Sequence, residues 1–288
     1  MKAKLVLAVV ALCLSFGMSF AQDYKITYEM KWKPTKTASE YQKELFVLLT
    51  HENAPSDFLQ YNRFHQDSTA TKVITEYFKK NTGGDLMIPN GGREPIFSAI
   101  ITKDIANKKI KVEDKAFASV FETTYPCAIH WNLEKEATPE NIMGYSVQKA
   151  TTQFGGRDWT AFYTPEIPIY DGSYKFYGLP GLILKIEDAT GDYAFEIKAI
   201  TKESTDISQR NFMRKKDELT PKQWEAFWKK YHQQPSMILE NLNSENLTYV
   251  IEGKSVADRE VKENYDKKEK ARLAHFENPI ELKNTCTK

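Results

Sequence analysis

A Gly-Leu-Pro-Gly sequence at residues 178–181 is the strongest local constraint on how this chain can fold. Glycine tolerates positive φ and proline fixes φ at about −65°, so Gly178, Pro180 and Gly181 predict a tight turn. Directly after it, Leu182, Leu184 and Ile186 alternate with three other residues, which is the period of a strand. The turn therefore fixes where a strand begins, and one face of that strand is expected to enter a core.

Many other segments also have the two-residue period of strands. From Tyr24 to Trp32 every second residue is apolar or aromatic and the residues between are polar, which predicts a half-buried antiparallel strand. Residues 56–62, with Phe58 and Tyr61, are interpreted as an irregular aromatic connector. Further strands are predicted at residues 44–50, 97–103, 109–113, 117–123, 129–134, 142–154, 158–163, 182–188 and 193–201, with a hairpin turn at 189–192. Short runs at intervals of about ten residues are typical of a meandering sheet.

The hydrophobic period changes after residue 202. Thr220, Pro221 and Gln223 supply an N-cap, a proline at the first helical position and a capping-box partner, so a helix is expected to begin at Pro221. Its apolar residues form one stripe at helical spacing, namely Trp224, Phe227, Trp228 and Tyr231. Residues 254–275 are charged almost all round, so a helix there would be mostly solvated and would end at Asn278-Pro279.

These patterns together predict an α+β protein. We expect a large curved antiparallel sheet, similar to a half-open barrel that wraps a helix, packed by C-terminal helices at about residues 207–277. No repeat or low-complexity linker divides the sequence, so residues 22–288 are expected to form a single domain.

The N-terminus has the features of a cleaved secretory signal. Lys2 and Lys4 precede an apolar run, and Ser19 and Ala21 are the small residues of a cleavage site after residue 21. The apolar run is shorter than the ~20 residues that span a membrane, so no transmembrane segment is expected in the mature chain. We therefore predict a secreted or periplasmic protein.

The charge balance excludes a class of partners. The chain has 40 Lys and Arg against 39 Asp and Glu, and loss of Lys2 and Lys4 with the signal lowers the first number to 38. A nearly neutral protein has no strong electrostatic attraction for nucleic acid, so no nucleic-acid partner is expected.

Several ordered motifs resemble one known family. The six residues Gly178, Leu179, Pro180, Gly181, Leu182 and Ile183 spell the signature of the GLPGLI family. Further similar pieces follow the family order: Gly144-Tyr145, Gln148-Lys149-Ala150, Gly156-Arg157, Ala161-Phe162-Tyr163-Thr164, Ile167-Pro168 and Asn278-Pro279-Ile280-Glu281-Leu282. The resemblance implies a secreted or periplasmic protein of the kind found in Bacteroidota, and it brings no assigned function and no catalytic residues.

Two cysteines remain after removal of the signal. An oxidising compartment would allow Cys127 and Cys286 to form a disulfide, but one is mid-chain and the other is close to the end. A disulfide and two separate thiols are therefore both open.

Compact catalytic motifs are absent from the sequence. The five histidines are scattered without metal-site spacing, no GxSxG sequence occurs, and Cys127 and His130 would face opposite sides of a strand. We predict no metal and no cofactor. The candidate contacts for a ligand or partner are Arg157 and Asp158, a charge pair beside aromatic residues, together with Tyr163 and the turn residue Leu179. The competing interpretation of the charge pair is a salt-bridged turn.

Three functions remain. The first is a non-enzymatic binding protein that holds a lipid, peptide or envelope protein against an aromatic sheet face. The alternative is a hydrolase or another enzyme whose site assembles only in three dimensions, and the third is a structural envelope component. A pocket with convergent polar groups and perturbed carboxylates would favour the enzyme.

Overall fold

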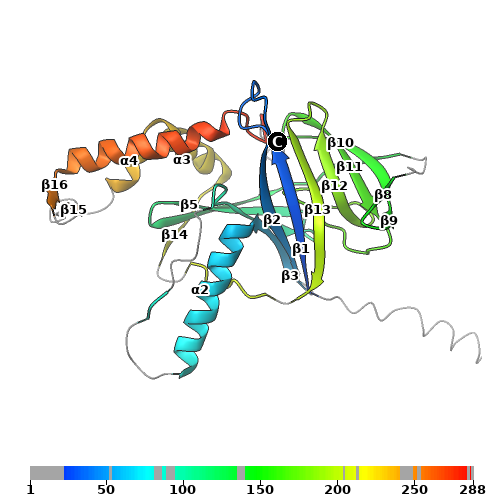
Figure 1. The fold of residues 1–288 in the computed structure, drawn as a ribbon, viewed down its shortest axis with the longest axis horizontal. Coiled ribbons are helices and arrows are strands. Elements are labelled where there is room, and N and C mark those ends of the chain that lie inside the picture. The colour runs from blue at the N-terminus through cyan, green and yellow to red at the C-terminus, as the bar shows by residue number, and fades with distance from the viewer. Residues whose placement is uncertain are drawn as a thin grey trace, which may run out of the picture.

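The computed structural model describes residues 23–51, 54–80, 86–88, 95–134, 140–203, 205–211, 214–240, 249–251, 254–283 and 286 (Figure 1). The predicted signal peptide lies outside the described residues, so its cleavage stays a prediction.

The strands are numbered in chain order. They are β1 Tyr24–Trp32, β2 Gln42–His51, β3 Ala54–Gln60, β4 Ile100–Asp104, β5 Lys109–Ala116, β6 Ser119–Pro126, β7 Asn132–Leu133, β8 Asn141–Ile142, β9 Tyr145–Ser146, β10 Gln148–Phe154, β11 Arg157–Thr164, β12 Leu182–Asp188, β13 Tyr193–Lys202, β14 Lys215–Glu218, β15 Tyr249–Ile251 and β16 Lys254–Val256. The helices are α2 Tyr61–Lys80, α3 Pro221–Gln233 and α4 Asp258–Leu273, with short 3-10 turns η1 Pro235–Leu239 and η3 Ala274–Phe276.

A single curved sheet of twelve strands dominates the fold, in the order β14-β6-β5-β4-β3-β2-β1-β13-β12-β11-β10-β7. Most neighbours in the sheet are consecutive hairpin strands, as the sequence predicts, and only β14 pairs in parallel, with β6. The N-terminal strand β1 is central, since it pairs with β2 on one side and with β13 on the other (Figure 1). The α+β class and the curved antiparallel sheet are thus confirmed.

One face of the sheet carries the main core. The alternation in β1 is reproduced, because Ile26, Tyr28, Met30 and Trp32 are all at most 2% exposed. Strands from both halves of the sheet contribute to the same cluster, including Phe58 of β3 and Phe195 of β13, whose rings lie 6.1 Å apart. The buried face is therefore the inner face of the curve.

An irregular segment, and not a helix, fills this inner face. Residues 171–179, which we call the plug segment, connect β11 to β12, and Phe176 is completely buried against Trp159 with a ring separation of 4.8 Å. The same segment contacts the opposite half of the sheet, where Asp171 pairs with Lys103 of β4. The expectation that the sheet wraps a helix is wrong, because the turn before Leu182 folds the chain back into the interior.

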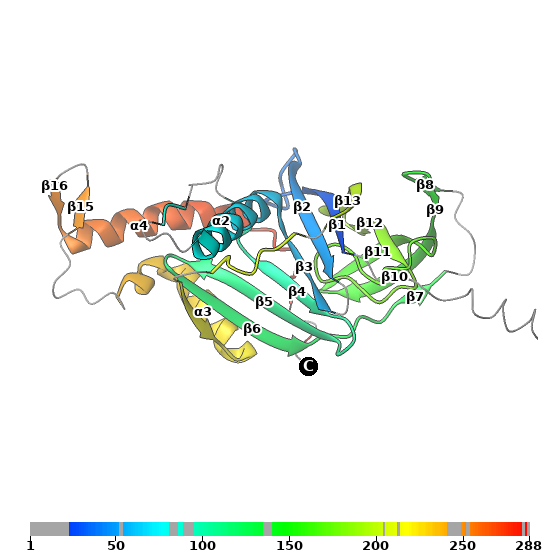
Figure 2. The same cartoon turned by 90° about the horizontal axis from the view of Figure 1, so that it is seen from below.

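The outer face of the sheet is covered in part by α2, which the sequence analysis missed. Residues 56–62 are not an irregular connector, since Ser56 lies within β3 and the helix begins at Tyr61. Phe64 of α2 packs with Val47 and Leu59 of the neighbouring strands β2 and β3 (Figure 2). The helix is hard to find in the sequence because its buried residues include the ion pair of Arg63 and Asp67.

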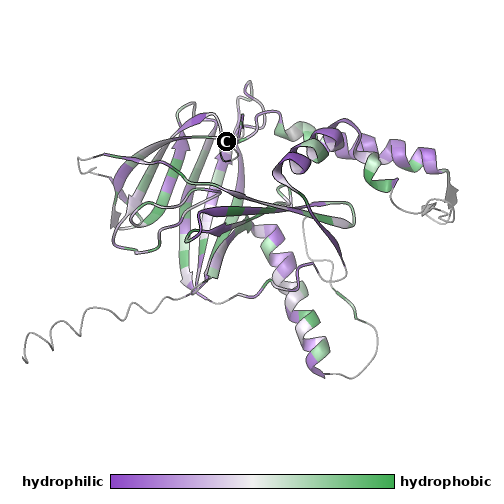
Figure 3. Ribbon diagram, turned by 180° about the vertical axis from the view of Figure 1, so that it is seen from behind, coloured by the Kyte–Doolittle hydropathy of each residue, from purple (hydrophilic) through white to green (hydrophobic). Residues whose placement is uncertain are grey.

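The predicted C-terminal helices are present. Thr220 caps α3 through the expected capping box, and Phe227 packs on Phe121 of β6 with a ring separation of 4.2 Å. Figure 1 shows α3 and α4 extending away from the main body of the sheet. No residue of α4 is buried, and the ribbon in Figure 3 is coloured as hydrophilic along most of this helix. The helix is shorter than predicted at its start, where residues 254–256 form β16.

Strand positions agree closely with the sequence in the second half of the sheet. The strand after the Gly-Leu-Pro-Gly turn spans the predicted residues 182–188, and β12 and β13 form the expected antiparallel hairpin. The predicted strand at 142–154 is divided, since β8 and β9 form a separate small hairpin before β10 begins at Gln148. Positive φ at Met143 and Gly144 produces that turn.

Candidate functional site

Arg157 lies within a buried ion network. Its side chain is 3% exposed, and Nη1 lies 2.8 Å from Asp188 and 3.2 Å from Asp192. Nη2 donates to Asn278 Oδ1 at 2.6 Å, which ties the C-terminal residues to the sheet. Burial alone would raise the pKa of Asp192, but hydrogen bonds from Arg157, Asn278 and Thr190 outweigh burial and lower that pKa. The geometry gives Arg157 a structural position, with its donors used inside the chain.

The other three residues predicted to contact a ligand do not gather around Arg157. Asp158 follows it on β11 and is exposed, as alternation along a strand requires. Tyr163 is 2% exposed and its hydroxyl donates to Gln148 at 2.7 Å, while Leu179 is 1% exposed in the core. None of the four lines either of the two large cavities described below. A partner contact at these residues stays a prediction.

The turn residues Gly178 and Gly181 both have positive φ, of +93° and +148°. They differ in their surroundings, because a Cβ on Gly178 would meet nothing within 4 Å, whereas one on Gly181 would lie 2.0 Å from the carbonyl oxygen of Thr164. Gly181 therefore lets the end of the plug approach β11 closely, and Leu182 then starts β12 beside Thr164. The signature residues Gly178, Leu179, Pro180, Gly181, Leu182 and Ile183 thus shape the core.

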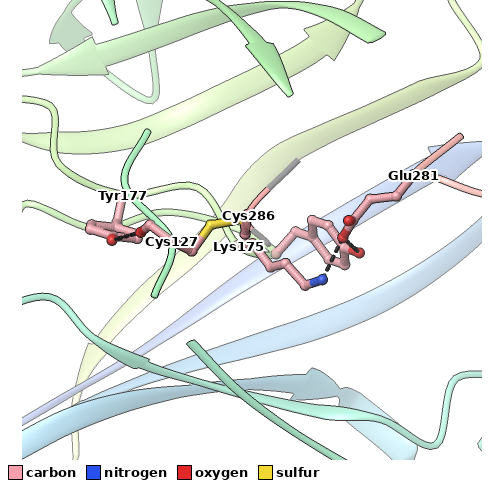
Figure 4. The surroundings of a disulfide bond; sticks show 6 residues. Cys127, Lys175, Tyr177, Glu281 and Cys286 are labelled. Atoms are coloured by element: carbon pink, nitrogen blue, oxygen red, sulfur yellow. Dashed lines mark hydrogen bonds and ion pairs between the residues drawn. A yellow bond between two sulfur atoms is a disulfide. The ribbon is translucent and has the colours of Figure 1, made fainter. Parts of the chain in front are cut away.

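A disulfide and an ion pair attach the C-terminal residues to the inner side of the sheet. Cys127 and Cys286 form a disulfide, and the Tyr177 hydroxyl donates to the carbonyl oxygen of Cys127 (Figure 4). Beside them Lys175 of the plug segment pairs with Glu281 (Figure 4). Burial alone would lower the pKa of Lys175, but Glu281 outweighs it and raises that pKa, so the lysine is held as a cation.

A cavity of about 740 Å³ lies between the inner face and the C-terminal helices, and we call it the sheet–helix cavity. Five large aromatic side chains line it from different parts of the chain, namely Phe97, Tyr125, Trp224, Trp228 and Phe276. Trp224 and Trp228 lie edge to face with centroids 5.5 Å apart, and Phe97 and Phe276 do so at 5.1 Å. The cavity therefore has two aromatic pairs in its walls.

A few ionisable groups line the same cavity. Asp114 of β5 accepts a hydrogen bond from Ser98 at 2.5 Å, yet burial raises its pKa above the ordinary carboxyl value. Arg272 is paired with Glu269 at 2.6 Å. Burial lowers the pKa of His232, and Arg272 lowers it further, so this imidazole is held neutral.

Two buried polar atoms in the cavity wall have no partner within the described chain. They are Oγ1 of Thr123, a residue that is 0% exposed, and Nε1 of Trp228. A buried polar atom without a hydrogen bond is costly, by roughly 1–3 kcal/mol, unless another molecule supplies the partner. Both atoms are shielded from the cavity space in this structure, so a ligand could reach them only after a local rearrangement of the wall.

Sequence reasoning found only part of this cavity. It identified Trp224, Phe227, Trp228 and Tyr231 as one apolar face of a helix. That face packs on the cluster of Ala116 and Phe121, and Trp224 also packs on the main core. Phe97, Asp114 and Phe276 come from segments that no motif connects. No pattern in the sequence indicated that Trp224 and Trp228 also line a cavity.

No metal or membrane element adds to these features. Among the described residues, no group of three or more His, Cys, Asp or Glu side chains is placed to hold a metal ion. Within the same part of the chain, no helix combines the length and the apolar character needed to cross a membrane.

The fold and site define an α+β protein with an open curved sheet, an internal plug and a cavity under its C-terminal helices. Residues 132–185 match the model of a family described as "Protein of unknown function (Porph_ging)". The matched range runs from β7 into β12 and contains the whole plug segment. Among curated proteins, none matches the sequence.

Solved structures of PNGF-II have a similar fold. The structure in space group P21 aligns with a TM-score of 0.50 and 16% identity, covering 73% of this chain and 34% of PNGF-II. The structure in space group C2 gives the same TM-score and identity, with 33% of PNGF-II covered. This chain thus spans about a third of the PNGF-II chain, and the likeness concerns the fold alone.

Proposed function

We propose that this protein is a non-catalytic binding protein of the GLPGLI type that holds an amphipathic lipid or peptide in the sheet–helix cavity. The observation that carries the proposal is the pair of aromatic walls around a cavity of about 740 Å³. Binding pockets for small molecules typically enclose ~300–1,000 Å³, with apolar walls and few polar groups.

One cation of the cavity wall suits the polar part of such a ligand. Arg272 lines the cavity and its side chain is 36% exposed, so it can meet an acceptor on a ligand as well as its partner Glu269. A ligand with an apolar body and an acceptor-bearing head would cover the aromatic rings and place its acceptor at Arg272.

An enzyme is the second candidate, and one observation favours it. Asp114 combines a raised pKa with a place in the wall of the sheet–helix cavity, and such carboxyls are frequent in catalytic sites. The Ser98 hydroxyl donates to Asp114, but no histidine contacts this pair among the described residues, so binding is the stronger proposal.

The proposal extends to location and organisation. A secreted or periplasmic protein would lose residues 1–21 and keep residues 22–288 as one domain. The disulfide of Cys127 and Cys286 supports an oxidising compartment. The mass of the protein from its own host tests cleavage, because removal after Ala21 predicts an N-terminus at Gln22.

Titration with 11-(dansylamino)undecanoic acid, a fluorescent amphipathic carboxylate, tests binding. We expect Trp224→Ala to weaken binding about tenfold, because it removes one aromatic wall. Lys222→Ala is the matched control, since Lys222 is exposed on the same helix and does not line the cavity. Equal affinities of the two variants would refute the cavity as the binding site.

A further inference from the structure

A second large cavity, of about 720 Å³, lies at the other end of β4. Ala99, which directly precedes β4, lines the sheet–helix cavity, whereas Lys103, near the end of β4, lines the second cavity. The strands β2, β3 and β4 and the chain just before the plug segment enclose it, so we call it the plug cavity. It shares no lining residue with the sheet–helix cavity.

The walls of the plug cavity are mainly apolar. They include three isoleucines, two prolines and a tyrosine, namely Ile105, Ile167, Ile169, Pro55, Pro168 and Tyr170. Tyr170 is 55% exposed, although it is one of the largest side chains of the cavity wall. An exposed aromatic ring beside a cavity of this size provides apolar surface at the entrance.

The buried polar groups of the plug cavity form one compact network, whereas His51, Asp104 and Asn107 lie at its more exposed side. Lys103 is 0% exposed, pairs with Asp171 and donates to the carbonyl oxygen of Gly172 at 2.5 Å. Ser56, 5% exposed, donates to the other oxygen of Asp171 at 2.5 Å. Three segments distant in sequence thus place a cation, a carboxylate and a hydroxyl at one point of the wall.

The charges in this network already compensate each other. Burial lowers the pKa of Lys103, and its partner Asp171, with a smaller contribution from Asp57, acts against that shift. A ligand cation would repel Lys103, and a ligand anion would compete for Lys103 and leave the Asp171 carboxylate buried without its partner. Either change carries the large cost of an uncompensated buried charge. A neutral dipolar group such as a hydroxyl or an amide has no such cost.

We infer that the plug cavity is a second binding site, which takes an uncharged, mainly apolar molecule with one hydrogen-bonding group. Its volume lies in the range of small-molecule pockets. The inference does not depend on the sheet–helix cavity, because the two cavities are lined by different residues.

A matched pair of dyes tests both parts of the inference. N-phenyl-1-naphthylamine is an uncharged aromatic amine, and 1-anilinonaphthalene-8-sulfonate has the same aromatic frame with a sulfonate. We expect the uncharged dye to bind about tenfold more tightly at the plug cavity. To isolate this site, the titrations use the Trp224→Ala protein, in which the sheet–helix cavity has lost an aromatic wall.

Two exposed alanines in hairpin turns provide the variants. Ala106 lies in the turn after β4 and lines the plug cavity, so Ala106→Trp should fill part of it and weaken the uncharged dye about tenfold. Ala118 is equally exposed in the turn after β5 and lines neither cavity, so Ala118→Trp should leave binding unchanged.

Each outcome decides a part of the inference. Equal binding of the uncharged dye by the two tryptophan variants would overturn the plug cavity as a site. Equal binding of the two dyes, with both affected by Ala106→Trp, would overturn the restriction to uncharged ligands. If Ala106→Trp does not fold, as judged by circular dichroism, Ala54→Trp at the exposed start of β3 fills the same cavity from the opposite wall.

Discussion

The two glycines of the turn allow a backbone effect to be separated from a steric one. Gly181→Ala and Gly178→Ala both place a methyl group on a residue with positive φ. At Gly178 the methyl group would enter open space, whereas at Gly181 it would lie 2.0 Å from the carbonyl oxygen of Thr164 and 2.9 Å from the Cα atom of Pro165. These are backbone atoms, so no side-chain rotation can relieve the clash.

The expected losses follow from these two contributions. The left-handed conformation costs a non-glycine residue about 1–2 kcal/mol, and this applies to both variants. Overpacking against fixed atoms adds roughly 1–3 kcal/mol, and this applies to Gly181→Ala alone. We therefore expect a loss of about 1–2 kcal/mol for Gly178→Ala and about 2–5 kcal/mol for Gly181→Ala.

Urea denaturation followed by tryptophan fluorescence measures both losses, provided that the slope with denaturant stays constant between variants. Thr164 pairs with Leu182, so the clash should also disturb the pairing of β11 with β12. Hydrogen exchange of the amides in these strands should then be faster in Gly181→Ala. Equal stability of the two variants would show that the close approach to Thr164 is not a constraint on the fold.

Three further predictions concern buried charges and the disulfide. Arg157→Met should destabilise the protein by about 3–5 kcal/mol in urea, because it leaves buried carboxylates unpaired; a loss below about 1 kcal/mol would contradict the network. Burial lowers the pKa of Lys115 to about 8. The free energy of unfolding of the wild type relative to Lys115→Met should therefore increase by about 3 kcal/mol from pH 7 to pH 10.5. A difference that stays constant with pH would argue against burial as the cause. Removing the Cys127–Cys286 bond by Cys286→Ser should cost about 2–5 kcal/mol; unchanged thermal unfolding would show that the C-terminal residues are held by other contacts.

The sign of the Lys115 prediction follows from its two pKa values. The unfolded lysine titrates near 10.5 and the folded one at about 8, so between these values the unfolded state binds more protons. The free energy of unfolding therefore rises as the pH increases through this interval. The loss of stability caused by burying the charged lysine is fully present below pH 8. Replacement by methionine removes the proton and with it this part of the pH dependence.

The parts of the fold set by local patterns could be predicted from the sequence. Strict alternation identified β1, and the Gly-Leu-Pro-Gly turn located the start of β12. The capping box at Thr220 fixed the first residue of α3. In each case a few neighbouring residues determine the structure, so no knowledge of distant contacts is required.

The helix α2 could not be predicted because its buried face is polar. Arg63 is 1% exposed and pairs with Asp67 and with Glu113 of β5. A search for apolar periodicity counts these charges as solvent-facing, and the chain passes from Gln60 of β3 into the helix without glycine or proline. Only the position of Glu113 on a distant strand explains why charged residues are inside.

The candidate sites depend on still more distant contacts. Phe97 and Phe276 form one aromatic pair of the sheet–helix cavity although they are 179 positions apart (276 − 97). Lys103 and Asp171 meet only because the plug segment folds back across the sheet. Such contacts leave no local motif, so these residues could not be selected from the sequence.

The central position of β1 has a consequence for synthesis of the chain. One edge of β1 can pair with β2 as soon as β2 has been made, but the other edge pairs with β13. The paired residues, from Tyr24 with Lys202 to Trp32 with Tyr193, lie about 170 positions apart in the sequence. During translation this aromatic strand therefore presents an open edge, and such edges promote aggregation. Folding should be slow because its key pairing is so distant in sequence. Fragments ending before Tyr193 should accumulate as aggregates, because the second edge of β1 stays unpaired in them.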